Sequence, residues 1–300
     1  MRISIGEVDG NEWEKFCQKL LKLKYNDYQE VSARYGGDLG IEGFTHTGIA
    51  FQCYCPDGEL PSDVLYEKQK GKVTRDIKKL LKNEAELKRL LGNIIIKEWH
   101  FLTPRHDNKE LIAHCVKKSK EVIASGKSHV SKDFKILILT EDNFLPERDI
   151  YVTAGHGQII PEVTEISEEE VKKWKVSNNE YFETLENKLG KIISDINKRN
   201  IQTINRIKDY LLGQNILEQI RKEYPSHYEK ITRLKNAIEI EVEMTSAIPN
   251  NNPDKYLKDT LSDYQKNIDA QLKESIERST VIRLGQEAIS DWLIRCPLDF

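Results

Sequence analysis

Hydrophobic positions repeat with two different periods along the chain, and the pattern changes near residues 160–175. Before that region, apolar runs of strand length alternate with amphipathic helical segments. After it, nearly every apolar stripe has the three-to-four-residue spacing of a helix. Strands joined through helices pair in parallel and a hairpin adds an antiparallel part, so the N-terminal half predicts a mixed sheet. We therefore expect an α/β domain over residues 1–160 and an all-α helical domain over residues 161–300.

The N-terminal half predicts eight elements in the order α-β-β-β-α-β-α-β. Amphipathic periodicity and capping residues place the helices at 11–24, from Ser62 to about Leu91, and at 108–124. Apolar runs and turn residues place strands at 28–34, 49–54, 93–103 and 134–140, and a short second strand begins at Glu42.

The C-terminal half predicts a bundle of helices. Its stripes are too short and too interrupted for an extended coiled coil. The apolar residues at helical spacing include Leu185, Leu189, Ile192, Ile207, Ile231, Leu234, Tyr264, Ile268 and Leu272. A loop at residues 249–253 separates the last two stripes, and we expect the apolar end of the chain to dock in the bundle or on a partner. This domain is a candidate for assembly with other protein subunits or for regulation.

The composition is that of a soluble globular protein, with 38% hydrophobic and 32% charged residues. No apolar run approaches the roughly 18 residues of a membrane span, so we expect no membrane partner and a cytoplasmic location. The formal net charge is −3, so contact with nucleic acid requires a local basic patch. The five cysteines lack paired zinc-ligand spacing and are predicted to be reduced thiols.

An acidic, glycine-rich turn precedes the strand at 49–54. Residues 36–43 read Gly-Gly-Asp-Leu-Gly-Ile-Glu-Gly, which supplies the carboxylates of Asp38 and Glu42. The following hairpin returns Gln52 towards them. Carboxylates and other oxygen ligands are what Mg²⁺ prefers, with phosphate and water completing its shell. Asp38, Glu42 and Gln52 are therefore candidate catalytic and metal-binding residues, although glycine and aspartate are also common in ordinary turns.

This arrangement resembles the PD-(D/E)xK superfamily of restriction-endonuclease-like proteins, most closely its Mrr-like branch. There an acidic Gly-Gly-Ile-Asp-Gly strand is followed by Gln-x-Lys; here the second motif is Gln52-Cys53-Tyr54. The resemblance covers about residues 10–155. It implies a Mg²⁺- or Mn²⁺-dependent nuclease, with DNA as the expected substrate. It also implies that Glu14 on the first helix is a further metal ligand, although a solvated helix glutamate is an equally open interpretation. Tyr54 stands where the family has its lysine.

The lysine of that family stabilises charge on the phosphate or orients the attacking water, and a neutral phenol cannot replace it. The helix after the hairpin offers substitutes. Its predicted buried stripe is Val73, Ile77, Leu80 and Leu81. We expect Lys72 to supply the missing cation. The nucleic-acid-binding candidates on the same helix are Lys68, Lys70, Arg75 and Lys79, although a basic helix face is often simply solvated.

Two functions remain open from the sequence. The first is a metal-dependent nuclease, an effector or subunit of a bacterial anti-phage or restriction system. The second is a catalytically inactive nuclease-fold protein that binds nucleic acid or serves as a scaffold in a protein complex. The retained acids and Gln52 favour the first, whereas Tyr54 and the near-neutral net charge favour the second.

Overall fold

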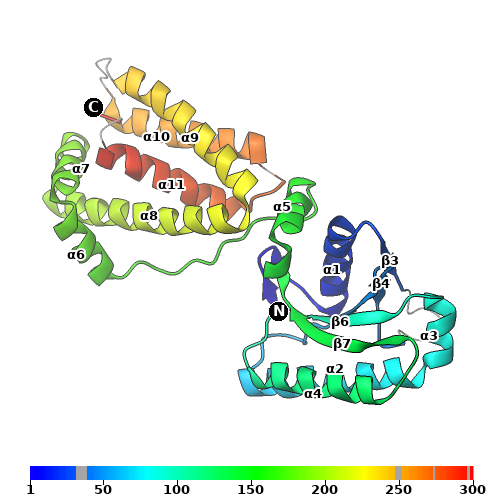
Figure 1. Ribbon diagram of the computed structural model, residues 1–300. Helices are drawn as coiled ribbons and strands as arrows, with labels where there is room; N and C mark the ends of the chain where they lie inside the picture. Colours follow the sequence, from blue (N-terminus) through cyan, green and yellow to red (C-terminus); the bar gives the residue numbers. More distant parts are fainter. Residues whose placement is uncertain (32–38, 247–251, 273, 296–297, 300) are drawn as a thin grey trace. The chain divides into compact units, whose positions relative to one another are not determined.

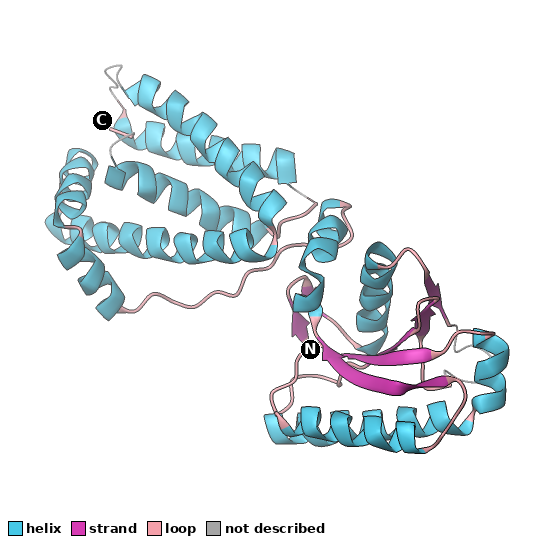
Figure 2. Ribbon diagram, viewed as in Figure 1, coloured by secondary structure: helices cyan, strands magenta, loops and turns pink. Residues whose placement is uncertain are grey.

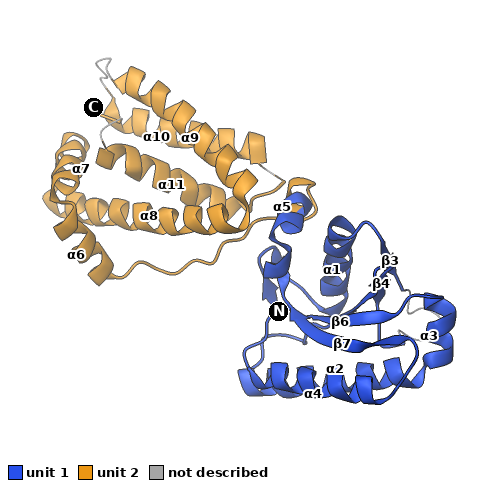
Figure 3. Cartoon of the chain, viewed as in Figure 1, with its two compact units in different colours: residues 1–151 blue, residues 152–300 orange. Residues whose placement is uncertain are grey.

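Two compact units make up the chain, residues 1–151 and residues 152–300 (Figures 1 and 3). The computed structural model describes all residues except 32–38, 247–251, 273, 296–297 and 300. The division falls within helix α5 (Leu145–Thr153), earlier than residue 160. Residues just after it belong to the second unit because Ile159 forms a parallel bridge with Ile276.

A five-stranded mixed sheet forms the centre of the first unit (Figure 2). Its strands, in spatial order, are β3 (Tyr28–Glu30), β4 (Gly43–Thr45), β5 (Ile49–Cys53), β6 (Ile96–Leu102) and β7 (Val130–Leu139). The β3–β4 and β4–β5 pairs are antiparallel, whereas β5–β6 and β6–β7 are parallel. The predicted mixed sheet and the order of its elements are confirmed, with a short hairpin of β1 (Arg2–Ile3) and β2 (Gly6–Glu7) added in front.

Helices cover both faces of this sheet (Figure 1). Helix α1 (Gly10–Lys24) lies on one face, and its start is fixed by a capping box between Asp9 and Glu12. On the other face lie α2 (Ser62–Lys82), α3 (Glu84–Leu91) and α4 (Glu110–Ala124). The single helix expected from Ser62 to Leu91 is broken at Asn83, where the backbone leaves helical geometry.

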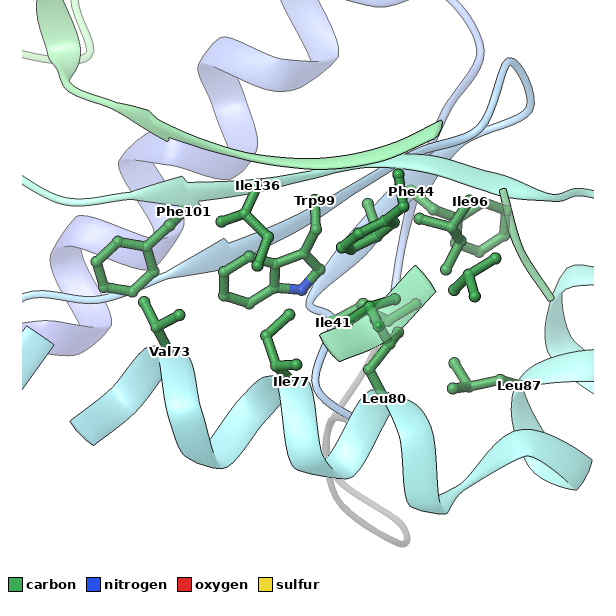
Figure 4. Close-up of a cluster of buried hydrophobic side chains, with 14 of the residues drawn as sticks. Ile41, Phe44, Val73, Ile77, Leu80, Leu87, Ile96, Trp99, Phe101 and Ile136 are labelled. Atoms are coloured by element: carbon green, nitrogen blue, oxygen red, sulfur yellow. The ribbon is translucent and has the colours of Figure 1, made fainter. Parts of the chain in front are cut away.

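The sheet separates two apolar cores. Val73, Ile77 and Leu80 of α2 pack under Trp99 and Phe101 of β6 (Figure 4). On the opposite face, the apolar residues of α1 pack on alternate side chains of β5 and on neighbouring residues, namely Trp13, Phe16, Cys17, Leu20, Leu21, Phe51, Cys53 and Leu102. Because side chains alternate along a strand, Ala50 and Gln52 point to the α2 face. The core therefore places Gln52 towards the basic helix.

The second unit is the predicted helical bundle. Its helices are α6 (Glu168–Ser177), α7 (Asn179–Ile192), α8 (Ile196–Glu223), α9 (Pro225–Ser246), α10 (Pro253–Leu272) and α11 (Arg278–Arg295). Most of α11 is buried, and α7, α8 and α10 pack around it. The chain end docks on α7, where Lys188 Nζ donates to the carbonyl of buried Leu298 over 2.7 Å. Within the described residues, none of the helices combines the length and apolarity of a membrane span.

A buried ion network joins α9 to α11. Lys235 Nζ lies 2.7 Å from both Glu287 Oε1 and Asp291 Oδ2. Arg295 also binds Asp291, with its Nε 2.6 Å from Oδ1. Each buried carboxylate of α11 thus has a cationic partner, as buried charge requires.

The approach of α8 to α11 depends on Gly213, and this gives a test of the bundle. A Cβ at Gly213 would overlap Cβ of Glu287. We expect Gly213→Ala to lower the free energy of unfolding by about 1–3 kcal/mol through overpacking, despite the higher helix propensity of alanine. Urea unfolding followed by far-ultraviolet circular dichroism measures this. Gly190→Ala is the matched control, since its new methyl meets only the movable end of Arg199, and equal stability of the two variants would contradict the prediction.

Candidate active site

The turn that leads into β4 is pressed against helix α2. Leu39 and Gly40 both have positive φ, 50° and 84°. A Cβ at Gly40 would overlap the backbone oxygen of Asp76, so glycine is required by space as well as by conformation. Trp99 Nε1 donates to the Gly40 carbonyl over 2.9 Å and secures the turn from the sheet side. The turn is therefore held between a buried indole and the middle of α2.

Glu42 follows this turn and is held through both its backbone and its carboxylate. Its N–H donates to Phe51 O over 2.7 Å, and Gln18 Nε2 of α1 donates to its carbonyl over 3.2 Å. Its carboxylate accepts from the Cys53 N–H, 2.8 Å from Oε2, and from the Gln52 side-chain amide at Oε1. Only 8% of the residue is exposed. The structure thus brings the predicted pair Glu42 and Gln52 into direct contact.

A second carboxylate and a cation act on Glu42. Burial, and next the negative charge of Glu14, raise the pKa of the Glu42 carboxyl to about 7. The Cys53 backbone N–H and the positive charge of Lys72 lower this pKa and oppose the rise. Glu14 comes from α1 and Lys72 from α2, so elements on both faces of the sheet act on one carboxylate. Three of the predicted site residues therefore share one electrostatic environment.

Gln52 supplies a buried polar atom without a partner. The residue is fully buried, and its Oε1 accepts no hydrogen bond from the protein, although its Nε2 donates to Glu42. A buried amide oxygen without a donor is costly, and a cation would satisfy it. Two carboxylates and an amide oxygen are hard donors of the type that suits Mg²⁺ or Mn²⁺. The chemistry of Glu14, Glu42 and Gln52 therefore fits a divalent cation.

The fourth predicted ligand, Asp38, lies outside the described residues. In the part of the chain that is described, no group of three or more His, Cys, Asp or Glu side chains is arranged to hold a metal ion. The oxygen donors among the described residues are thus Glu42, Gln52 Oε1 and the nearby Glu14, and the placement of Asp38 stays a prediction.

Lys72 is the best-placed cation of α2. Its side chain is 18% exposed, and its Nζ lies 2.8 Å from Asp76 Oδ2. Lys79 also contacts this carboxylate, with Nζ 3.1 Å from Oδ1. Asp76 is 1% exposed and takes a place in the buried face of α2, whereas Leu81, which was expected there, is only partly buried. Sequence reasoning missed Asp76; its signal was an acid four residues after Lys72 at the border of the apolar stripe.

The four predicted nucleic-acid-binding residues of α2 do not all lie on one side of the helix. Lys68, Arg75 and Lys79 lie on the same flank as Lys72. Lys68 and Arg75 line a shallow hollow of about 520 Å³ together with Val64 and the acids Asp63 and Glu67. Lys70 is separated from Lys68 by two residues and hence by about 200° around the helix. It pairs with Glu67 at 3.1 Å and lies 5.2 Å from the centre of the Tyr66 ring. The structure therefore leaves Lys70 out of the basic flank.

Tyr54, at the position where the resemblance predicts a lysine, is a packing residue. Its ring stacks on Phe101, with centroids 6.0 Å apart, and its backbone N–H donates to Leu102 O over 2.8 Å. Burial raises the pKa of its phenol above the ordinary value. The side chain is thus neutral at physiological pH and belongs to the edge of the apolar core.

The pKa of Glu42 predicts how stability depends on pH. Its folded-state pKa of about 7 exceeds the ordinary value of 4.5, so the folded protein binds an extra proton between these values. Stability therefore falls as pH rises through this window and stays lower above it. Without divalent metal, we expect Glu42→Gln to be more stable than the wild type at pH 8, by on the order of 2 kcal/mol, and little different at pH 5. Urea unfolding at the two pH values measures this.

The exposed Glu86→Gln in α3 is the control, and it should show no such pH-dependent difference. The Gln52 amide can turn over to accept from the introduced amide, so the substitution preserves the hydrogen bonds. A Glu42→Gln advantage that is equal at pH 5 and pH 8 would show that the carboxylate is not buried in this way.

Comparison with known proteins identifies no relative of the chain. No protein-family model, no curated protein and no solved structure matches the chain. The functional assignment must therefore come from the geometry of Glu42, Gln52, Glu14 and Lys72.

Proposed function

We propose that the protein is a nuclease that hydrolyses phosphodiester bonds with Mg²⁺ or Mn²⁺. The observation that carries the proposal is the fully buried Gln52 Oε1, which has no partner in the protein and lies on the residue that contacts Glu42. A carboxylate of raised pKa beside this oxygen, together with the neighbouring charge of Glu14, forms a site that favours a cation.

Glu42, Gln52 and Glu14 are the proposed ligands among the described residues, and Asp38 is the fourth. When bound, the divalent cation lowers the pKa of water and stabilises charge on the phosphate. The chain's own residues supply orientation and a second positive charge. Gln52 and the Cys53 N–H hold the Glu42 carboxylate, and Lys72 faces the same region from α2. Lys72 supplies the positive charge that the neutral phenol of Tyr54 cannot supply.

The exposed basic flank of α2 is the proposed nucleic-acid contact, with DNA as the expected substrate. Lys68 and Arg75 line a hollow on the same helix that presents Lys72. Phosphate contacts of this kind position a strand without reading its sequence. The helical unit is proposed to join other protein subunits, as in a cytoplasmic anti-phage or restriction complex. The support for that role is its separate, well-packed α11 core.

A catalytically inactive nucleic-acid-binding or scaffold protein is the second candidate. It is favoured by the neutral Tyr54 and by the hydrogen bonds that already reach both oxygens of Glu42. In that case the buried acid would be satisfied by the protein and Lys68 and Arg75 would still bind phosphate.

Cleavage separates the two candidates. We expect the full chain to cut DNA with Mg²⁺ or Mn²⁺ and to stop with EDTA. Glu42→Gln should reduce the rate by at least about a hundredfold, because it removes the ligand charge and keeps the side-chain shape. Lys72→Met should reduce it by about 10²–10³, as expected for loss of a group that stabilises developing charge. Single-turnover cleavage of a labelled duplex measures each rate.

Tyr54→Phe is the matched control, and it should leave the rate nearly unchanged because the phenol is a packing group. Cleavage that survives Glu42→Gln would exclude this site as its source. The scaffold would be favoured if the wild-type protein binds DNA but does not cut it with Mg²⁺ or with Mn²⁺, whether partner subunits are present or absent.

Binding tests the basic flank separately from catalysis. We expect Lys68→Glu with Arg75→Glu to weaken DNA binding and to flatten its dependence on salt, since fewer counterions are released. The double variant Lys117→Glu with Lys120→Glu makes the same charge change at two exposed lysines of α4 and serves as the control. Fluorescence anisotropy at several salt concentrations measures both. Equal losses in the two double variants would indicate a general charge effect and no defined interface.

A further inference from the structure

Asp76 is a buried carboxylate that is not among the proposed metal ligands. It lies in the middle of α2, is 1% exposed, and contacts Lys72 on one oxygen and Lys79 on the other. A buried carboxylate is unfavourable unless cations and hydrogen bonds compensate it. An apolar residue would fill this position of the helix at no such cost, as Val73 and Ile77 do. The acid therefore needs an explanation beyond packing.

The two cations that Asp76 contacts differ in exposure. The Lys72 side chain is 18% exposed, whereas that of Lys79 is 46% exposed. A lysine has a flexible four-carbon stem and a strongly hydrated head, so an unpaired one turns to solvent. Lys72, paired with the Asp76 carboxylate at 2.8 Å, is instead partly buried. From there its charge reaches Glu42.

The backbone of Asp76 is tied to the same site. Its carbonyl oxygen lies against Gly40, in the turn two residues before Glu42, at a distance that leaves no room for a side chain. One residue of α2 thus contacts both the turn that carries Glu42 and the lysine whose positive charge lowers the pKa of Glu42. This coupling fixes the position of the cation relative to the carboxylate.

We propose that Asp76 is a positioning residue that holds Lys72 at the Glu42–Gln52 site through their ion pair. The inference rests on the proposed nuclease function for its catalytic meaning, while the ion pair itself can be tested without any cleavage. Lys79 contacts the same carboxylate from the exposed side and is not needed for the placement of Lys72. It therefore supplies a matched control.

The position of Lys72 is tested by chemical labelling of the folded full chain. Trace acetylation with acetic anhydride, followed by peptide mass spectrometry, reports the reactivity of each lysine. In Asp76→Asn we expect Lys72 to become several-fold more reactive, while Lys117 and Lys120 on α4 stay unchanged. In Lys79→Met the reactivity of Lys72 should not change. Equal Lys72 reactivity in Asp76→Asn and the wild type would overturn the proposal.

The catalytic consequence is tested by a double-mutant cycle. We expect Asp76→Asn to lower kcat by about a hundredfold, because a displaced catalytic group loses its orientation, with KM unchanged. Adding Asp76→Asn to Lys72→Met should cause no further loss, since the two residues act as one unit. Lys117→Met, at an exposed lysine of α4, should keep the wild-type kcat. Additive losses in the double variant would assign Asp76 a structural role and overturn positioning.

The outcomes separate the inference from the proposed function. Wild-type cleavage combined with unchanged Lys72 reactivity in Asp76→Asn leaves the nuclease standing and removes the positioning role. Raised Lys72 reactivity without wild-type cleavage under either metal removes the nuclease and with it the catalytic role of Asp76. If Asp76→Asn unfolds, Asp76→Glu replaces it, because this variant keeps the negative charge and moves it by one methylene. Positioning then predicts that Asp76→Glu lowers kcat, while the lysines of α4 keep their reactivity.

Discussion

The burial of one carboxylate, that of Glu42, is the constraint on which the rest of the first unit depends. A carboxylate that is 8% exposed and close to a second one is stable only if donors and a cation surround it. The sheet provides the Gln52 amide and the Cys53 N–H, α1 provides the Gln18 contact to its backbone, and α2 provides the charge of Lys72. Helices on both faces of the sheet therefore meet at this residue.

This arrangement has a local cost. The raised pKa of Glu42 and the partnerless Gln52 Oε1 both show buried polar groups that the described part of the protein does not fully satisfy. Binding sites commonly impose such a local cost on a fold. Ordinary apolar core residues at the same positions would give a more stable protein. The helical unit shows the contrast. Its buried charges, Lys235, Glu287 and Asp291, are paired within the protein and stabilise the contact between α9 and α11.

The basic helix has an inner side and an outer flank that differ in burial. Its inner side packs under the sheet through Val73, Ile77 and Leu80, and Asp76 at the border of that side contacts Lys72. Its outer flank presents Lys68 and Arg75 beside a shallow hollow. A cation for chemistry must be fixed, whereas a cation for phosphate contact can remain mobile and hydrated. The Lys72 side chain is only 18% exposed, whereas Lys68 and Arg75 are exposed.

The sequence by itself determined the kind of fold and the Glu42–Gln52 pair, because these depend on local patterns. Periodicity separated the sheet-forming half from the helical half, and the strand alternation around Gln52 set the face on which it lies. The tertiary structure alone decided the burial of Asp76 and the contact of its backbone with Gly40. Both depend on how α2 is rotated against the sheet. That rotation is set by the packing of Val73, Ile77 and Leu80 under Trp99 and Phe101, contacts between residues distant in the chain, which no local pattern encodes.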